Sequence, residues 1–244
     1  MLTHSQRLRS VLSLTEKRLA SLIQQVWYHP QLNLLYPEFL FSTYGLTVAS
    51  APAMRTAALL CREQPEDDPL HKWLEAYYIE HAEEEEGHAD WLLEDLASLG
   101  IPRERVLNRL PYASVAALVG SQYYWMHHVH PIAYLGYIAV IETPAQIDFL
   151  QEVSQRTGIP LSSMSCHYRH AELDPGHVAE FDTALDSLPL SPAQQDLITV
   201  SAISTIGHLE WVFTDVLEHF QRIDAPSAAS TIFTATQSVT ATLP

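Results

Sequence analysis

Two short stretches hold residues whose types and spacing could do chemistry, and the first is YYIEHAEEEEGHADWLLEDL, residues 77–96. It places two histidines and four consecutive glutamates within eight positions. In an α-helix, positions i, i+3, i+4 and i+7 share a face. Four side chains have that spacing: His81, Glu84, Glu85 and His88. Glu83 and Glu86 would point elsewhere. A glutamate run alone is as often a solvated acidic face, so the interpretation depends on what the rest of the chain supplies.

The second stretch is CHYRHAELDPGH, residues 166–177. Its polar residues step by three, four and three positions, which places them on one helical stripe: His167, His170, Asp174 and His177. Alone, His167 is better explained as a hydrogen-bonded core histidine or as a group that orients a metal ligand. The other three combine imidazole and carboxylate, a mixture that suits iron or manganese. Calcium avoids imidazole and structural zinc favours cysteine.

A third element is the lone carboxylate of Glu142, which ends the apolar segment YLGYIAVIETP. Burying an unpaired carboxylate is costly, so a glutamate on an apolar helix face predicts a cationic partner. The alternative is a water-exposed position at the helix end beside Pro144. That alternative would be favoured without the two histidine-containing stretches.

Two metal ions held close together need bridging carboxylates and neutral imidazoles on facing helices, as in carboxylate-bridged di-iron bundles. The predicted metal ligands are His81, Glu85, His88, Glu142, His170, Asp174 and His177. Glu85 is favoured over Glu84 because Glu85-x-x-His88 has the spacing used in such bundles. Glu142 is predicted to bridge the ions and so to be the catalytic carboxylate.

The elements that must position these residues are helices. Apolar residues recur at spacings of three and four, and only 8 glycines occur in 244 residues, which argues against a turn-rich β fold. About seven helices are expected in one bundle: 5–27, 38–61, 69–99, 112–128, a segment from 132 that is bent near Pro144, one over 163–185, and a last helix opened by Pro192. We expect a single helical domain over residues 1–224 and a poorly ordered or lightly docked tail over 225–244.

Charge and cysteine content narrow the functional classes. A formal net charge of -16 makes nucleic acid and anionic membranes poor partners. The chain contains no uninterrupted apolar run near the roughly 20 residues that span a bilayer, and its first residues lack a signal-peptide pattern. The two cysteines, Cys61 and Cys166, form no CxxC pair, so reduced thiols and a cytoplasmic location are expected.

Taken together, HAEEEEGHADWLLEDLASLG, the isolated Glu142 and HAELDPGH resemble the heme-oxygenase-like di-iron oxidases and oxygenases, over roughly residues 30–220. This resemblance implies an all-α, single-domain heme-oxygenase-like bundle. It also implies two Fe²⁺ ions and dioxygen as co-substrate. The positions that match the family's ligands are His88, Glu142, His170, Asp174 and His177. His81 is a departure, because several members have a glutamate there.

The resemblance further implies oxidation of a small carboxylate substrate, most often an amino acid or a modified amino acid, by N-oxygenation, carbon–carbon cleavage or nitrile formation. Fatty-acid oxidative decarboxylation and non-catalytic iron binding are the alternatives. An external electron donor and a homodimer are expected at the level of the family. Four residues are predicted to contact the substrate: Tyr44, Tyr134, Tyr137 and Arg169. For the tyrosines the competing interpretation is core packing, and for the arginine it is a surface position.

Overall fold

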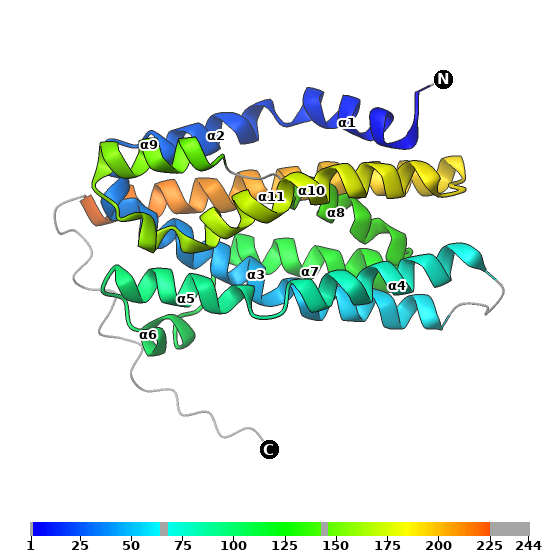
Figure 1. Cartoon of the computed structure of the whole chain (residues 1–244), viewed down its shortest axis with the longest axis horizontal. Coiled ribbons are helices and arrows are strands. Elements are labelled where there is room, and N and C mark those ends of the chain that lie inside the picture. Colours follow the sequence, from blue (N-terminus) through cyan, green and yellow to red (C-terminus); the bar gives the residue numbers. More distant parts are fainter. Residues whose placement is uncertain (1, 64–67, 143–145, 225–244) are drawn as a thin grey trace, which may run out of the picture.

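The structure is a computed structural model that describes residues 2–63, 68–142 and 146–224. Helices account for all its regular secondary structure over these ranges, and they run along the long axis of the molecule (Figure 1). The all-α prediction is therefore confirmed. The side chains of residues 173–175, 177 and 220–224 lie outside the description, as does the whole predicted tail, 225–244.

The helices follow one another along the chain without any long helix-free stretch in the described ranges. Their bounds are α1 His4–Thr15, α2 Lys17–Trp27, α3 Leu32–Arg62, α4 Pro69–Glu84, α5 His88–Ser98, α6 Arg103–Leu107, α7 Ala113–His128, α8 Tyr134–Ile141, α9 Ile147–Thr157, α10 Ser165–Ser187 and α11 Pro192–Asp224, with 3₁₀ turns at Pro131–Ala133 and Leu161–Ser163.

The expected bundle of about seven helices is found as eleven α-helices over the described residues, mainly because two predicted helices are divided. Residues 5–27 form α1 and α2, which meet at Glu16, and residues 69–99 form α4 and α5, which are separated at Gly87. The predicted helix 38–61 instead begins at Leu32 and continues through Pro37 and Pro52. Pro144, where a bend was predicted, lies outside the described residues, between α8 and α9.

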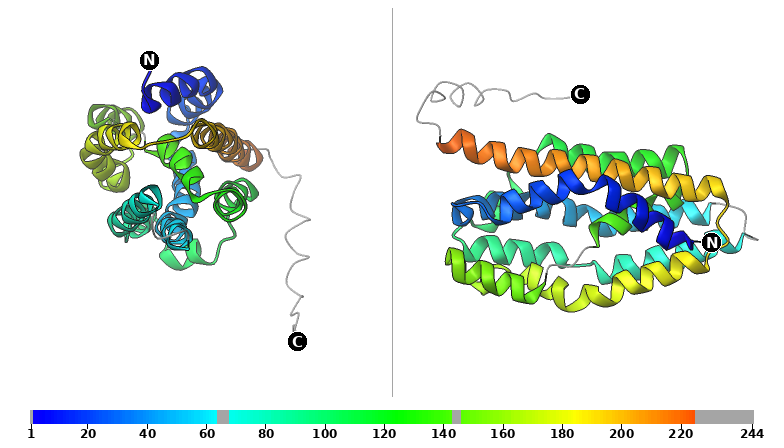
Figure 2. Two further views of the ribbon diagram at one scale, coloured as in Figure 1. Left: turned by 90° about the vertical axis from the view of Figure 1, so that its right-hand side faces the viewer. Right: turned by 90° about the horizontal axis from the view of Figure 1, so that it is seen from above.

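The two longest helices, α3 and α11, form the centre of the bundle. α3 packs against α4, α5 and α7, and α11 packs against α2, α7 and α8. Seen end-on, the short α8 lies inside the ring of helices (Figure 2), and its residues Tyr134–Ala139 are buried. α8 therefore delivers Glu142, which follows it directly, to the interior of the bundle.

One segment, Pro192–His219 of α11, is long and apolar enough to cross a membrane by length and composition, with a mean hydropathy of 1.2. The central helix of a globular bundle has the same composition, and α11 packs against α1, α2, α3, α7 and α8 here. Length and hydropathy alone are weak support for a membrane span.

Candidate metal centre

Three predicted ligands meet in the structure. Glu85, His88 and His170 each offer one oxygen or nitrogen atom, and these atoms lie within 4.8 Å of one another. They come from the α4–α5 junction and from α10, segments far apart in the sequence that pack together. A carboxylate and two imidazoles converging in this way suit a divalent transition metal such as iron.

The break at Gly87 places Glu85 and His88 together. α4 ends at Glu84, and Gly87 adopts a left-handed conformation with φ 88° before α5 begins at His88. Left-handed backbone is accessible to glycine at little cost. The prediction of one continuous helix over 69–99 was wrong here, because Gly87 makes a turn where a weak helical position was expected.

His88 is buried among aromatic rings beside the other two residues of this group. The side chain is 7% exposed, its ring stacks on Trp91 at 4.0 Å, and the edge of its ring meets His170 at 5.0 Å. Its Nδ1 is buried without a hydrogen bond, although Oε2 of Glu85 lies 3.3 Å away. Buried polar atoms are nearly always satisfied, so a buried imidazole nitrogen without a hydrogen bond, beside a carboxylate and a second imidazole, fits a place where a cation binds.

His170 is held in an orientation suited to metal binding. Its Nδ1 lies 2.8 Å from the carbonyl oxygen of Cys166. Donation from Nδ1 to that carbonyl leaves Nε2 with the lone pair, the arrangement found around most metal-bound histidines.

Asp95 joins the two ligand-bearing segments and was not predicted. It is 0% exposed on α5, and its carboxylate accepts hydrogen bonds from the backbone N–H of Ser165 at 3.0 Å, from the Ser165 hydroxyl at 2.6 Å and from the Cys166 N–H at 3.0 Å. Burial raises the pKa of Asp95, against the opposing effect of these hydrogen bonds. A sequence signal existed, because Asp95 shares the apolar face of Leu92 and Leu96.

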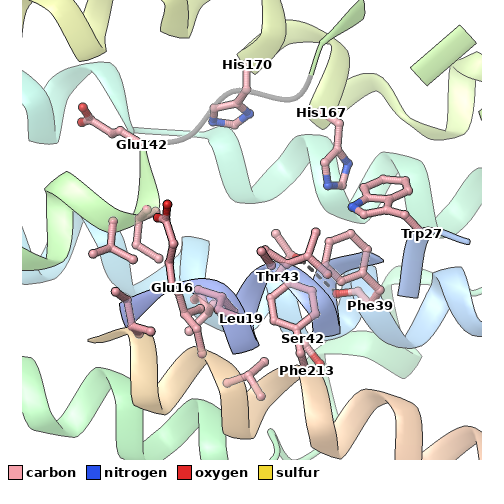
Figure 3. Close-up of a pocket in the computed structure, with 18 of the residues that line it drawn as sticks. Glu16, Leu19, Trp27, Phe39, Ser42, Thr43, Glu142, His167, His170 and Phe213 are labelled. Carbon is pink, nitrogen blue, oxygen red and sulfur yellow. Dashed lines mark hydrogen bonds between the residues drawn. The ribbon is translucent and has the colours of Figure 1, made fainter. Parts of the chain in front are cut away.

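Glu142 lies in the wall of the same cavity as Glu85 and His170. It follows the last residue of α8, and its backbone N–H donates to the Ile138 carbonyl at 3.0 Å. Its side chain lines the same cavity wall as His170 (Figure 3). Glu142 is not one of the three converging residues. The pKa of Tyr77 is raised first by the burial of Tyr77 itself and second by the negative charge of Glu142.

His81 is placed differently from the expectation of a stripe shared with His88. Its ring lies 3.9 Å from that of Tyr77, and its Nδ1 faces the Tyr77 carbonyl at 3.0 Å. The division between α4 and α5 removes the common helical face. Glu84 is exposed, whereas Glu85 is half-buried beside His88, so the position of Glu85 is the one suited to metal.

Asp174 and His177 belong to α10, whose backbone is continuous, so positions 170, 174 and 177 share a helix face. Their side chains lie outside the described residues. Both residues remain predicted ligands.

Glu85, His88 and His170, which we call the metal group, lie beside a cavity of about 1220 Å³. Glu85, Glu142 and His170 lie in its wall, and most of the remaining lining comes from apolar side chains of α2, α3, α8 and α11 (Figure 3). Helices from both ends of the sequence thus enclose it, a long-range feature that periodicity does not reveal.

Among the four predicted substrate contacts, Tyr137 lines the cavity. The structure places the other three elsewhere. Tyr134 is 1% exposed and stacks on Tyr137, Tyr44 packs in the core around α3, and Arg169 is exposed with its guanidinium over the Trp91 ring at 4.7 Å. In each case the competing interpretation, core packing or a surface position, describes the residue.

The fold and the three converging residues define a class: an all-helical protein with a candidate metal centre next to a large cavity. The family of iron-containing redox enzymes matches residues 53–208, well over half of the sequence, and the chain belongs to that family. A search of the curated proteins gives no significant match.

Solved structures agree on the fold. A domain of unknown function with a heme oxygenase-like fold from Shewanella denitrificans is similar, with a TM-score of 0.72, 20% identity and coverage of 92% of this chain and 93% of that one. A TenA homolog from Pseudomonas syringae pv. tomato has a TM-score of 0.65, 14% identity and coverage of 87% and 92%. A TenA homologue from P. horikoshii has a TM-score of 0.59, 14% identity and coverage of 89% and 99%. The expected heme-oxygenase-like fold is confirmed.

Proposed function

We propose that this chain is a non-heme di-iron enzyme that uses dioxygen to oxidise a small carboxylate substrate, an amino acid or a modified amino acid. The observation that carries the proposal is the convergence of Glu85, His88 and His170 beside a large cavity, with the buried Nδ1 of His88 left without a hydrogen bond. A solvated acidic face would place neither His88 nor its nitrogen in the interior.

The remaining predicted ligands would complete a two-ion site. Glu142 lies in the same cavity wall and would bridge the ions, while His81, Asp174 and His177 would complete the coordination. Bound iron supplies the redox chemistry with dioxygen.

The protein's own part is positioning. Asp95 and the Cys166 carbonyl hold the start of α10 and the His170 ring, so the ligand geometry exists before a metal binds. The apolar cavity wall excludes water and holds the substrate beside Glu85 and His170. We also propose a cytoplasmic enzyme that takes electrons from an external donor and forms a homodimer, with no nucleic-acid or membrane partner.

Fatty-acid decarboxylation is the second candidate, and the apolar lining of the cavity favours it. A protein that only binds iron has less need of a cavity of this size next to the ligands.

Anaerobic loading with Fe²⁺ followed by metal analysis tests the site. We expect about two iron ions per chain, and loss of iron in His170→Ala and in Glu142→Ala. His208→Ala is a matched control, because His208 on α11 makes the same Nδ1 hydrogen bond to the carbonyl four residues earlier, at 2.8 Å from Ser204, away from the converging residues. Absence of iron in the parent protein, or equal iron in parent and both site variants, would contradict the proposal.

Exposure of the loaded protein to oxygen tests the chemistry. A transient visible absorption should decay faster when the true substrate is present. If no member of a panel of amino acids and fatty acids changes that decay, non-catalytic iron binding becomes the better account.

A further inference from the structure

One end of the cavity is aromatic. His167 lies on α10 one helical turn before His170, and with Trp27, Phe39 and Phe213 it forms what we call the aromatic end (Figure 3). Its rings contact one another: Phe39 stacks on His167 at 5.5 Å, Trp27 meets His167 edge-on at 5.5 Å, and Phe213 lies 5.7 Å from Phe39. These spacings are those of packed aromatic pairs.

Tyr36 fixes the orientation of the His167 ring. The hydroxyl of Tyr36 lies 3.3 Å from Nδ1 of His167, and the Tyr36 side chain is fully buried. Burial, followed by the charge of Asp95, raises the pKa of Tyr36 well above its usual value, so the hydroxyl keeps its proton. Among the described residues the Tyr36 hydroxyl has no other hydrogen-bond partner, so its proton is satisfied only if it donates to Nδ1, which leaves the ring's own proton on Nε2.

His167 is neutral at physiological pH. Burial, and secondarily the neighbouring His170, lower its pKa to about 4. Over the part of the chain that the structure describes, no side chain or carbonyl accepts a hydrogen bond from Nε2, and His167 lines the cavity. The Nε2–H of His167 is therefore a hydrogen-bond donor at the aromatic end, in addition to the indole N–H of Trp27.

Building on the proposed function, we infer that the substrate is an aromatic amino acid whose ring occupies the aromatic end and carries a hydrogen-bond acceptor that is bound by Nε2–H of His167. A flat ring can pack against the cavity-facing sides of these rings in the offset or edge-on arrangements that aromatic pairs prefer. His167 and His170 are three residues apart, which is a rise of about 4.5 Å along the axis of α10. That separation suits a ring one methylene away from the reacting α-carbon better than the end of a long chain.

Charge supports an uncharged ring at this end. Trp27, Phe39, Phe213 and neutral His167 contribute no formal charge, so a carboxylate or ammonium there would lose its hydration without compensation. The acceptor is therefore a neutral oxygen such as a phenol hydroxyl. His167 is a specificity-determining residue in this arrangement and takes no part in the chemistry.

Binding measured anaerobically by calorimetry, on iron-loaded and on iron-free protein, tests the inference. The probes are L-tyrosine, L-phenylalanine, L-leucine and octanoate. We expect L-tyrosine to bind about tenfold more tightly than L-phenylalanine, because one buried hydrogen bond distinguishes them, and L-leucine and octanoate to bind more weakly than either. The preference should be present with and without iron, because no proposed ligand belongs to the aromatic end.

The diagnostic variant is His167→Phe, which keeps a ring against Phe39 and removes the donor. The tyrosine preference should fall to about one while phenylalanine binding is retained. Tyr36→Phe should reduce the preference less, because it only frees the ring to exchange its tautomer. If the single variant at 167 unfolds because the Tyr36 hydroxyl is left unpaired, the double variant Tyr36→Phe/His167→Phe removes that group as well.

His128→Phe is the matched control, since His128 is exposed and its ring lies 5.0 Å from that of Tyr124; it should keep the full preference. Tighter binding of octanoate than of the aromatic amino acids, or an unchanged tyrosine preference in His167→Phe, would overturn the inference. Either result combined with normal iron binding leaves the proposed iron enzyme standing. Failure to bind iron refutes the proposed function whichever amino acid binds.

Discussion

The two segments that supply the metal group each contain a glycine, and the structure uses the two glycines in opposite ways. Gly87 has φ 88° and divides α4 from α5, whereas Gly176 and its neighbour Pro175 lie within the continuous α10. In α10, helical periodicity alone brings positions 170, 174 and 177 to one face. At the α4–α5 junction a turn brings Glu85 and His88 together. A glycine between ligands therefore has no fixed meaning until the required backbone conformation is known.

The N-terminal end of α10 depends on α5 for its capping hydrogen bonds. Met164, at the N-terminal end of α10, gives no side-chain capping hydrogen bond. Asp95 of α5 supplies that cap from another helix, by binding the N–H groups of Ser165 and Cys166. An acidic group at a helix N-terminus also interacts favourably with the helix dipole. The alignment of His88 with His170 thus depends on one buried carboxylate.

The largest effect is expected where this dependence is removed, in Asp95→Ala. Three hydrogen bonds to a charged acceptor are lost and two backbone N–H groups are left unsatisfied, so the free energy of unfolding should fall by roughly 3–5 kcal/mol. Iron affinity should fall with it. Urea denaturation and iron titration measure the two effects.

Asp90→Ala is the control on the same helix. Asp90 is exposed and pairs with Arg103 at 2.7 Å on the surface, so its loss should cost less than about 1 kcal/mol. Equal effects of the two substitutions would show that Asp95 does not join α5 to α10.

Acid should act on α10 through His167. Its pKa in the folded protein is about 4, below the usual value near 6.5. Between these values the unfolded chain binds a proton that the folded chain does not, so folding stability falls as pH falls from about 6.5 to 4 and is fully present above that window. The contribution is roughly 3 kcal/mol.

Denaturation of iron-free protein at pH 7 and pH 4.5 measures this dependence, and the same pair of experiments on His167→Phe isolates it. The variant should lose distinctly less stability on acidification than the parent. An identical pH dependence in both would mean that His167 takes up its proton in the folded protein as readily as in the unfolded chain.

Local periodicity was enough to predict much of this molecule. The all-α fold, most helix positions and the grouping of Glu85, His88 and His170 follow from spacings of three and four and from the chemistry of the side chains. These features depend on residues that are close together in the sequence, so residue type and spacing are enough to predict them.

What could not be predicted is long-range or depends on a single backbone angle. The hydrogen bonds of Asp95 to Ser165 cross 70 positions of sequence, and the cavity wall combines α1 and α2 with α11. Tyr134 and Tyr44 carry the same residue type as Tyr137, yet only Tyr137 among them lines the cavity. The turn at Gly87 requires a positive φ, and a glycine within a helical pattern does not indicate whether one is needed.

The smallest expected effects compare the two glycines directly, by substituting alanine at each. An alanine Cβ at Gly87 would meet no atom within 4 Å, so the cost is purely that of a left-handed backbone, about 1–2 kcal/mol. Alanine there also favours continuing the helix, which would change the orientation of His88 relative to His170 and weaken iron binding. At Gly176 the Cβ would meet only Oε1 of Glu180, at an ordinary 3.8 Å, and alanine should stabilise α10 by about 0.5–1 kcal/mol. Thermal denaturation should show lower stability for Gly87→Ala and higher stability for Gly176→Ala. Iron titration should show reduced affinity only in Gly87→Ala. A stabilising Gly87→Ala with intact iron binding would mean that the α4–α5 turn is not needed to hold the metal group.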